Sequence, residues 1–137
     1  VGSGILEKSL KIQVSRLNLD HKVCFLGSRE DIPSLLNKSD CLLLPSLWEA
    51  FPIVLLEAAA SNIPVITTPV GSISAFVDND CGYVVKLKNF KDTMLEVLSN
   101  YNEAQMKSNK LHIKVTSNYQ INQVVKQYES VYQNIIE

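Results

Sequence analysis

The sequence has 137 residues, of which 46% are hydrophobic, and carries a formal net charge of −1 at pH 7. A chain of this length can bury a core of its own as one domain, and its nearly neutral charge gives no broad electrostatic basis for binding nucleic acid. No apolar run is long enough to cross a membrane. The cysteines lie far apart and form no C-x-x-C pair, a pattern typical of reduced thiols in a cytosolic protein. They are Cys24, Cys41 and Cys81.

Short apolar runs alternate with helical patterns along the first part of the chain. Apolar residues recur at helical spacing over 5–17, and a second, shorter helical pattern covers 31–40. Fully apolar strands separated by helices predict a parallel sheet covered on both faces. We therefore expect an α/β fold with a Rossmann-like, doubly wound sheet. The runs with the length and composition of buried strands are 23–27, 41–45, 64–68 and 82–85.

From Phe90 onward the chain is polar and helical, with Met94, Leu95 and Leu98 on one predicted helical face. The tail predicts an amphipathic helix with a wide apolar stripe. We therefore expect C-terminal helices after the sheet. The stripe consists of Val124, Val125, Tyr128, Val131, Tyr132 and Ile135.

Two polar features of the chain are interpreted as surface. Lys107, Lys110 and Lys114 fall on one helical face, which is typical of a solvated face; contact with a membrane surface is the alternative. His21 and His112 have no Asp or Ser partner at a spacing that indicates catalysis. We expect both histidines to lie at the surface.

The chain opens with the residues VGSG, which read as the end of a strand and the turn into the first helix. A G-x-G pattern alone indicates phosphate contact only weakly, because glycines commonly serve tight turns between strand and helix. The pattern predicts that a preceding β-α-β portion lies outside this sequence.

The stretch 46–66 is strongly apolar yet carries two carboxylates, Glu49 and Glu57. Pro52 suits the first helical position, because its φ is preset and its missing N–H is not needed there. The predicted helix runs on to about Ala60 and is apolar nearly all round, so it should be buried against the sheet. A buried, unpaired carboxylate is costly, so both acids must find partners in the protein or bind a ligand.

No residue in the sequence caps the start of this helix. Phe51 stands where Ser, Thr, Asp or Asn would accept a hydrogen bond from the first turn. The N–H groups around Ile53 and Val54 are therefore free, and a helix start with free donors after a parallel strand is ready to bind an anion. Ligands of open α/β sheets bind at the carboxyl ends of the strands, where this helix begins.

Glu57 lies inside that helix, and its side chain leans back toward the helix start. An ionised carboxylate only accepts hydrogen bonds, so the vicinal hydroxyls of a ribose are suitable donors to it. Glu49, in the loop before the helix, can face the same opening from the other side. The spacing alone leaves an alternative open, in which one carboxylate pairs with a lysine and the other is solvated.

The segment 46–72, SLWEAFPIVLLEAAASNIPVITTPVGS, resembles the signature of retaining glycosyltransferases with the GT-B fold, especially glycosyltransferase family 4. The motif of that family is two glutamates with seven residues between them, matched here by Glu49 and Glu57. The resemblance covers nearly the whole chain. Its further segments are 23–46, 78–85 and 117–132.

The resemblance implies a role for each matching residue. Glu57 would accept hydrogen bonds from the ribose hydroxyls of a nucleotide sugar, and Glu49, as the catalytic residue, would contact the sugar near the reacting carbon. The backbone amides that approach the sugar and diphosphate would be those of Phe51, Ile53 and Val54. The loop beside the base would consist of Gly27, Ser28 and Arg29, with Ile32.

The resemblance also implies an enzyme of two domains, of which residues 1–137 would be the C-terminal, donor-binding one. A sugar would pass with retention, and without a metal, from a nucleoside-diphosphate sugar, with UDP favoured, to a saccharide or lipid-linked acceptor. Fixed dipoles would stabilise the leaving diphosphate. The acceptor would bind the N-terminal domain, so this part alone should be inactive. The enzyme would be cytoplasmic and serve cell-surface polysaccharide or glycolipid synthesis, with peripheral membrane association left open.

The sequence departs from the family pattern in three respects. Ala50 replaces the usual glycine between Glu and Phe, a change of one methyl group. The usual Gly-Gly-x-Pro-Glu reads GSISA here, so that Ala75 replaces an acid. In the family, the first part of this domain supplies Arg and Lys for the phosphates, and the resemblance implies that this part lies outside the sequence. Two alternatives to a transferase therefore stay open: a non-catalytic module that binds a nucleotide sugar, and a nucleotide-sugar epimerase of the GT-B type.

Overall fold

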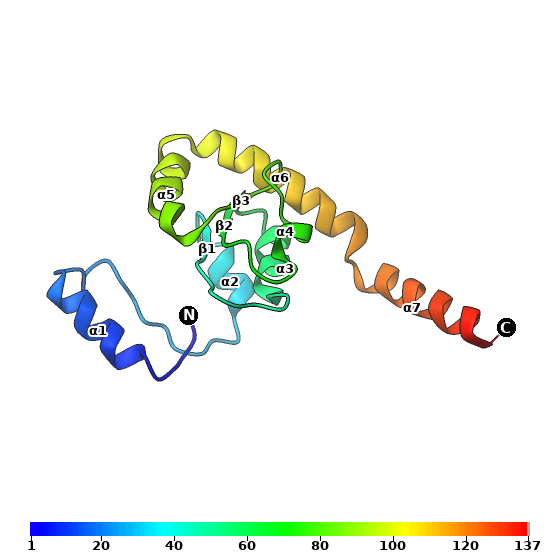
Figure 1. Cartoon of the computed structure of the whole chain (residues 1–137), viewed down its shortest axis with the longest axis horizontal. Helices are drawn as coiled ribbons and strands as arrows, with labels where there is room; N and C mark the ends of the chain where they lie inside the picture. The colour runs from blue at the N-terminus through cyan, green and yellow to red at the C-terminus, as the bar shows by residue number, and fades with distance from the viewer. Residues whose placement is uncertain (137) are drawn as a thin grey trace. The chain divides into compact units, whose positions relative to one another are not determined.

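The computed structural model describes residues 1–136, which form two compact units. The first unit is Val1–Ile32, and the second begins at Pro33. Figure 1 shows the order of the helices and strands along the chain. All strands belong to the second unit.

The first unit is built around α1 (Glu7–Arg16), which confirms the helix predicted over 5–17. Gly2 donates its N–H to the carbonyl oxygen of Gly27 at 2.7 Å, and this bond joins the segment before α1 to the segment after it. No residue of this unit is buried, and apolar side chains such as Leu6 and Leu10 are exposed. The unit therefore has no core of its own among the described residues.

The strand predicted over 23–27 is wrong, because this stretch has no strand structure. A strand requires a ladder of hydrogen bonds to a neighbour along its length. Two backbone bonds involve this stretch: Gly27 accepts from Gly2, and Val23 donates its N–H to the carbonyl oxygen of Leu19. The second bond closes a turn within the same segment and does not pair two strands. Apolar composition does not make a strand where no neighbour is paired with it.

Three short parallel strands form the sheet of the second unit, in the order β1-β2-β3. The register places Leu43, Ile66 and Tyr83 side by side. Because the strands are parallel, their carboxyl ends meet at one edge of the sheet. The strands, each inside a predicted apolar run, are β1 (Leu42–Leu44), β2 (Val65–Thr67) and β3 (Tyr83–Val84).

Helical connections join the strands, as parallel pairing requires. The predicted helix over 31–40 is present in a shorter form that precedes β1, and the helix predicted from Pro52 to Ala60 connects β1 to β2. These helices and the connections around β3 are α2 (Ile32–Leu36), α3 (Ile53–Ala60), α4 (Ile73–Phe76) and η1 (Leu87–Asn89).

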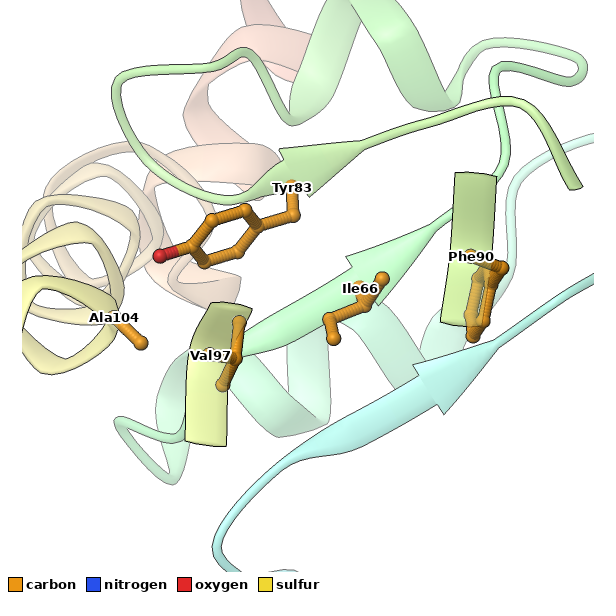
Figure 2. Packing of buried hydrophobic residues seen from close by; sticks show 5 residues of the cluster. All are labelled: Ile66, Tyr83, Phe90, Val97 and Ala104. Carbon is orange, nitrogen blue, oxygen red and sulfur yellow. The ribbon is translucent and has the colours of Figure 1, made fainter. Parts of the chain in front are cut away.

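Helices cover both faces of the sheet, which confirms the predicted α/β class (Figure 1). On one face, Ile66 packs with Phe90 and Val97 of the helix that follows β3 (Figure 2). Successive side chains along a strand point to opposite faces, so Val65 and Thr67, on either side of Ile66, face the other side of the sheet. There α3 packs against β2. The apolar side chains of both faces are buried, and this burial is the main driving force for the fold.

The predicted C-terminal helices follow the sheet in the described part of the chain as α5 (Phe90–Ser99), α6 (Tyr101–Asn118) and α7 (Ile121–Ile136). The buried face of α5 is formed by Phe90, Thr93 and Val97. The predicted apolar face is therefore wrong for Leu95 and Leu98, which are 55% and 75% exposed. The predicted stripe of α7 is present on a helix, but no described side chain of α7 is buried.

Helix α6 is held to the rest of the second unit by polar contacts as well as by packing. Lys114 donates to the carbonyl oxygen of Phe76 at 2.7 Å, and Lys107 lies over the ring of Tyr83 with its Nζ 5.0 Å from the ring centre. Nδ1 of His112 is 2.9 Å from the carbonyl oxygen of Ala59. The expectation of a solvated lysine face, and of a surface role for His112, is therefore wrong for these three side chains. Each of them binds a carbonyl or a ring that is distant in the sequence.

The three cysteines are free, as expected. Burial and the nearby charge of Asp40 raise the pKa of the Cys41 thiol to about 11, and burial also raises the pKa of Cys81 above its ordinary value. Cys24 is exposed. Since the thiolate is the reactive form, the two less exposed cysteines are chemically quiet.

No helix in the described part of the chain is both long enough and apolar enough to span a lipid bilayer.

Two adjacent threonines after Ile66 differ in how their hydroxyls are satisfied. Thr67 is 0% exposed, and its hydroxyl has no hydrogen-bond partner within residues 1–136, whereas Thr68 donates to the carbonyl oxygen of Ser46 at 2.5 Å. A buried polar group without a partner costs about 1–3 kcal/mol. Thr67→Val should therefore raise the free energy of unfolding by about 1 kcal/mol, and Thr68→Val should lower it by a similar amount. Urea unfolding of the two variants checks this, and a loss of stability in both would contradict it.

Candidate functional site

The start of α3 has no capping side chain, as the sequence predicts. Pro52 is the N-cap itself, with φ −77° and an extended ψ of 118°, so its prediction as the first helical residue is wrong by one position. Leu55 donates its N–H to the carbonyl oxygen of Pro52 at 3.1 Å. Within residues 1–136 the N–H groups of Ile53 and Val54 have no acceptor. Two donors at the positive end of the helix dipole are therefore available to an anion.

Glu57 lies on the second turn of α3 and is half-buried, although neighbours on the same helix such as Leu55 and Ala58 are fully buried. Glu49 lies in the loop before the helix and is also half-buried. Neither carboxylate forms an ion pair with any residue of the described chain. The alternative of a structural lysine pair is therefore not what the structure shows.

A neighbouring serine holds the carboxylate of Glu49. The Ser46 hydroxyl donates to Oε1 of Glu49 at 2.8 Å. One oxygen of the carboxylate is thus engaged, and among the described residues its other oxygen has no hydrogen-bond partner. A carboxylate offers about four lone-pair sites, so Glu49 can accept further hydrogen bonds from a ligand.

Phe51, the residue before the helix cap, anchors the loop through an aromatic contact. Its ring meets the ring of Phe76 edge to face, with 5.2 Å between the ring centres. Phe76 in turn meets Tyr119 in the same geometry at 5.4 Å. Such pairs add stability beyond the area that they bury. Ala50, next to Phe51, is exposed, and so is Ala75 on α4.

The predicted base-binding residues belong to the first unit. Gly27 has a φ of 64°, and Ser28 is exposed. Arg29 forms a two-pronged pair with Asp31, from Nε at 2.8 Å and from the terminal nitrogen at 2.7 Å. This hydrogen bond, together with the negative charge of Asp31, raises the pKa of Arg29 above its ordinary value. Ile32, half-buried, begins α2.

Residues 1–136 contain no group of three or more His, Cys, Asp or Glu side chains that could hold a metal ion.

Four residues around Glu49 have a structural role that the sequence reasoning did not assign. Three of them contact the glutamate loop from the segment after β2, which is distant in the sequence, and the fourth lies in the loop itself, three residues before Glu49. The local signal in the sequence is one hydroxyl residue after β1, and two hydroxyl residues with a glycine after β2. They are Ser46, Thr68, Gly71 and Ser72.

Gly71 is required by a close approach of two backbone segments. Its φ is 55°, and a Cβ there would overlap the carbonyl oxygen of Glu49 and stand 2.7 Å from the carbonyl oxygen of Ala50. Gly71→Ala should therefore lower the free energy of unfolding by about 2 kcal/mol or more, through strain and displacement of the Glu49 loop. Gly4→Ala is the control, because a Cβ there would meet no atom within 4 Å. Urea unfolding of both variants measures the difference; equal stability of Gly71→Ala and the parent chain would refute it.

The sequence of residues 1–112 matches the family described as Glycosyl transferases group 1. UDP-Gal:α-D-GlcNAc-diphosphoundecaprenol α-1,3-galactosyltransferase of Escherichia coli is 35% identical over 100 residues, which are 72% of this chain and 26% of that protein. N-acetyl-α-D-glucosaminyl L-malate synthase of Bacillus anthracis is 30% identical over 127 residues, 90% of this chain and 33% of that protein. The chain thus spans only about a quarter to a third of these relatives.

A solved structure shows the same fold. HepE of Anabaena, in complex with UDP and glucose, superposes with a TM-score of 0.86 at 21% sequence identity. The match covers 93% of this chain and 36% of HepE. The arrangement of a parallel sheet and flanking helices is thus that of the GT-B glycosyltransferase C-terminal domain.

Proposed function

Because the chain belongs to the glycosyl transferases group 1 family, we propose that it binds the nucleoside-diphosphate sugar of a retaining, family 4 glycosyltransferase. The observation that carries this proposal is the uncapped start of α3, with two free N–H donors at Ile53 and Val54. A helix N-terminus contributes about 0.3–2 kcal/mol toward a nearby negative charge. These two amides would bind the diphosphate, because it is the negatively charged part of a nucleotide sugar.

Glu57 is the proposed ligand of the ribose. It is half-buried on an otherwise apolar helix and has no ion-pair partner in residues 1–136. An ionised carboxylate accepts from two adjacent hydroxyls at once, and vicinal hydroxyls are the feature that a ribose offers. The partial exposure of Glu57 leaves its carboxylate within reach of a ligand.

Glu49 is the proposed catalytic residue, in contact with the transferred sugar near its reacting carbon. Its carboxylate is oriented by Ser46 and still has acceptor capacity. The backbone amide of Phe51, at the end of the same loop, would lie beside the sugar and diphosphate. When the bond between the anomeric carbon and the phosphate oxygen breaks, negative charge grows on the diphosphate, and fixed backbone dipoles at the start of α3 stabilise it.

UDP is the favoured carrier, and no metal is proposed. The E. coli relative is named for UDP-Gal, and HepE was solved with UDP and glucose. The loop of Gly27, Ser28 and Arg29, with Ile32, is proposed to lie beside the base. Helix dipoles and, in the upstream part of the domain, basic side chains would take the place of a cation.

The whole enzyme is proposed to have two domains, of which this chain is the C-terminal, donor-binding one. A saccharide or lipid-linked acceptor would bind the N-terminal domain, and the E. coli relative is named for an acceptor of diphosphoundecaprenol type. We place the reaction in cell-surface polysaccharide or glycolipid synthesis on the cytoplasmic side, at the inner face of the membrane. This chain alone would not catalyse transfer.

A non-catalytic module that binds a nucleotide sugar is the second candidate. Ala75, exposed on α4, stands where similar enzymes carry an acid, and this is the observation that favours it. Testing the full-length protein against a panel of nucleotide sugars and lipid-linked acceptors separates the two. Transfer to an acceptor establishes the enzyme, whereas donor binding without transfer to any acceptor establishes the module.

Replacing Glu57 tests its role directly. Glu57→Gln removes the negative charge and should weaken UDP binding by the full-length protein by about tenfold, because Gln accepts through a single neutral oxygen and the charge-assisted hydrogen bonds to the ribose are lost. Glu96→Gln, an exposed acid on α5, is the matched control and should bind UDP like the parent. Calorimetry measures both affinities. Unchanged affinity in Glu57→Gln, with unchanged thermal stability, would remove Glu57 from the site.

The isolated chain should bind UDP weakly, with a dissociation constant of about 1 mM, because the start of one helix supplies only part of the energy that holds a diphosphate. Adding a chelator should leave this affinity unchanged. Titration followed by NMR, with and without chelator, measures both, and the amide signals of Ile53 and Val54 should shift. Binding that disappears with chelator, or shifts confined to other residues, would show the anion site to be wrong.

A further inference from the structure

The loop that carries Glu49 is tied at both ends to the segment that follows β2. At its start, the Thr68 hydroxyl donates to the carbonyl oxygen of Ser46 at 2.5 Å. At its end, Ser72 donates twice to the carbonyl oxygen of Ala50, from its hydroxyl at 2.6 Å and from its backbone N–H at 3.1 Å. Each hydroxyl bond spans 22 residues of sequence. The loop is therefore held by tertiary contacts on either side of Glu49.

The two ties and the Ser46 side chain act on the same carboxylate. Thr68 fixes the backbone of Ser46, and the hydroxyl of Ser46 donates to Oε1 of Glu49. Thr68 is almost fully buried, so its hydroxyl is a fixed point for this chain of contacts. A displacement of either tie would change the direction in which the Glu49 carboxylate points.

The turn at Gly71 brings the second tie into place. This turn lies so close to the Glu49–Ala50 peptide that a Cβ at Gly71 would overlap the carbonyl oxygen of Glu49. Ser72, next along the chain, is exposed. Its hydroxyl bonds to the loop, and it caps no helix: α4 begins after it without a side-chain cap bond. The contact with Ala50 is thus the one bond that the Ser72 hydroxyl makes among the described residues.

We propose that Thr68 and Ser72 are positioning residues, which set the direction of the Glu49 carboxylate by clamping its loop at both ends. The inference rests on the proposed function, since it takes Glu49 to be the group that contacts the transferred sugar. A clamp on Glu49 affects the transfer step. UDP binding depends on the amides of α3 and on Glu57, and Phe51, whose amide is proposed to lie beside the diphosphate, is held separately by its ring contact with Phe76. The two residues should therefore govern kcat and leave nucleotide affinity unchanged.

The test of the clamp itself needs no activity. Trp48 precedes Glu49, is largely exposed, and is the single tryptophan of this sequence. Fluorine NMR of the full-length protein labelled with fluorotryptophan, with Trp48→Phe to assign its signal, reports on the loop. Ser72→Ala and Thr68→Val should shift or broaden the Trp48 signal. Ser72→Thr and Thr68→Ser, which keep the hydroxyl, should restore it.

A matched control separates the clamp from the general loss of a surface serine. Ser99 on α5 is also exposed, and its hydroxyl also donates to a backbone carbonyl, that of Glu96 at 2.8 Å. Ser99→Ala should leave the Trp48 signal unchanged. A Trp48 signal that stays unchanged in both Ser72→Ala and Thr68→Val would overturn the clamp.

Kinetics of the same variants then test what the clamp does. Ser72→Ala should lower kcat by about tenfold, with the UDP dissociation constant unchanged and with recovery in Ser72→Thr. Two results would overturn the positioning role: a loss of UDP affinity as large as the loss of kcat, or an unchanged kcat in a variant whose Trp48 signal is shifted or broadened. If Glu49→Gln keeps the full kcat while Ser72→Ala still frees the loop, it is the catalytic role of Glu49 in the proposed function that fails.

Discussion

The parallel sheet places the carboxyl ends of β1 and β2 at one edge, and the chain must leave both strands there. Backbone groups beyond the last ladder bond lose their strand partners and need others, from the protein or from water. In this molecule the two departing segments satisfy each other: Ser46 and Ala50 accept from Thr68 and Ser72. This crossing fixes the loop before α3, and with it the position of Glu49.

Side chains bind carbonyl groups at the end of α3, whereas no described side chain binds the N–H groups at its start. The start of the helix is therefore available to an anion. The carbonyl of Ala59, near the end of the helix, has His112 of α6 at 2.9 Å, and Gln105 donates to the carbonyl of Asn62 just beyond the end. At the start, by contrast, no side chain caps the helix. A helix that served only to fill the core would gain stability from a cap there. Leaving the first donors free costs stability and creates a place for an anion.

The sequence predicted those features of the fold that depend on local pattern. The α3 helix and three strands followed from apolar runs and from their flanking proline and glycine residues. It could not predict features that depend on a distant partner. The run 23–27 has no ladder, and Lys114 and His112 bind carbonyls 38 and 53 residues away, so the sequence spacing carried no signal of them. The same holds for Ser72, whose partner lies in another loop.

The two glutamates are therefore placed by different means. Glu57 is fixed by the helix that contains it, so its position depends mainly on residues of α3 and on the packing of that helix. Glu49 lies in a loop, where rigidity must come from tertiary bonds made by the segment after β2. Fixing a catalytic group in a loop requires surrounding contacts of this kind, because the backbone itself leaves it free to move. Changes after β2 should thus disturb Glu49 and spare Glu57, although both glutamates belong to one sequence motif.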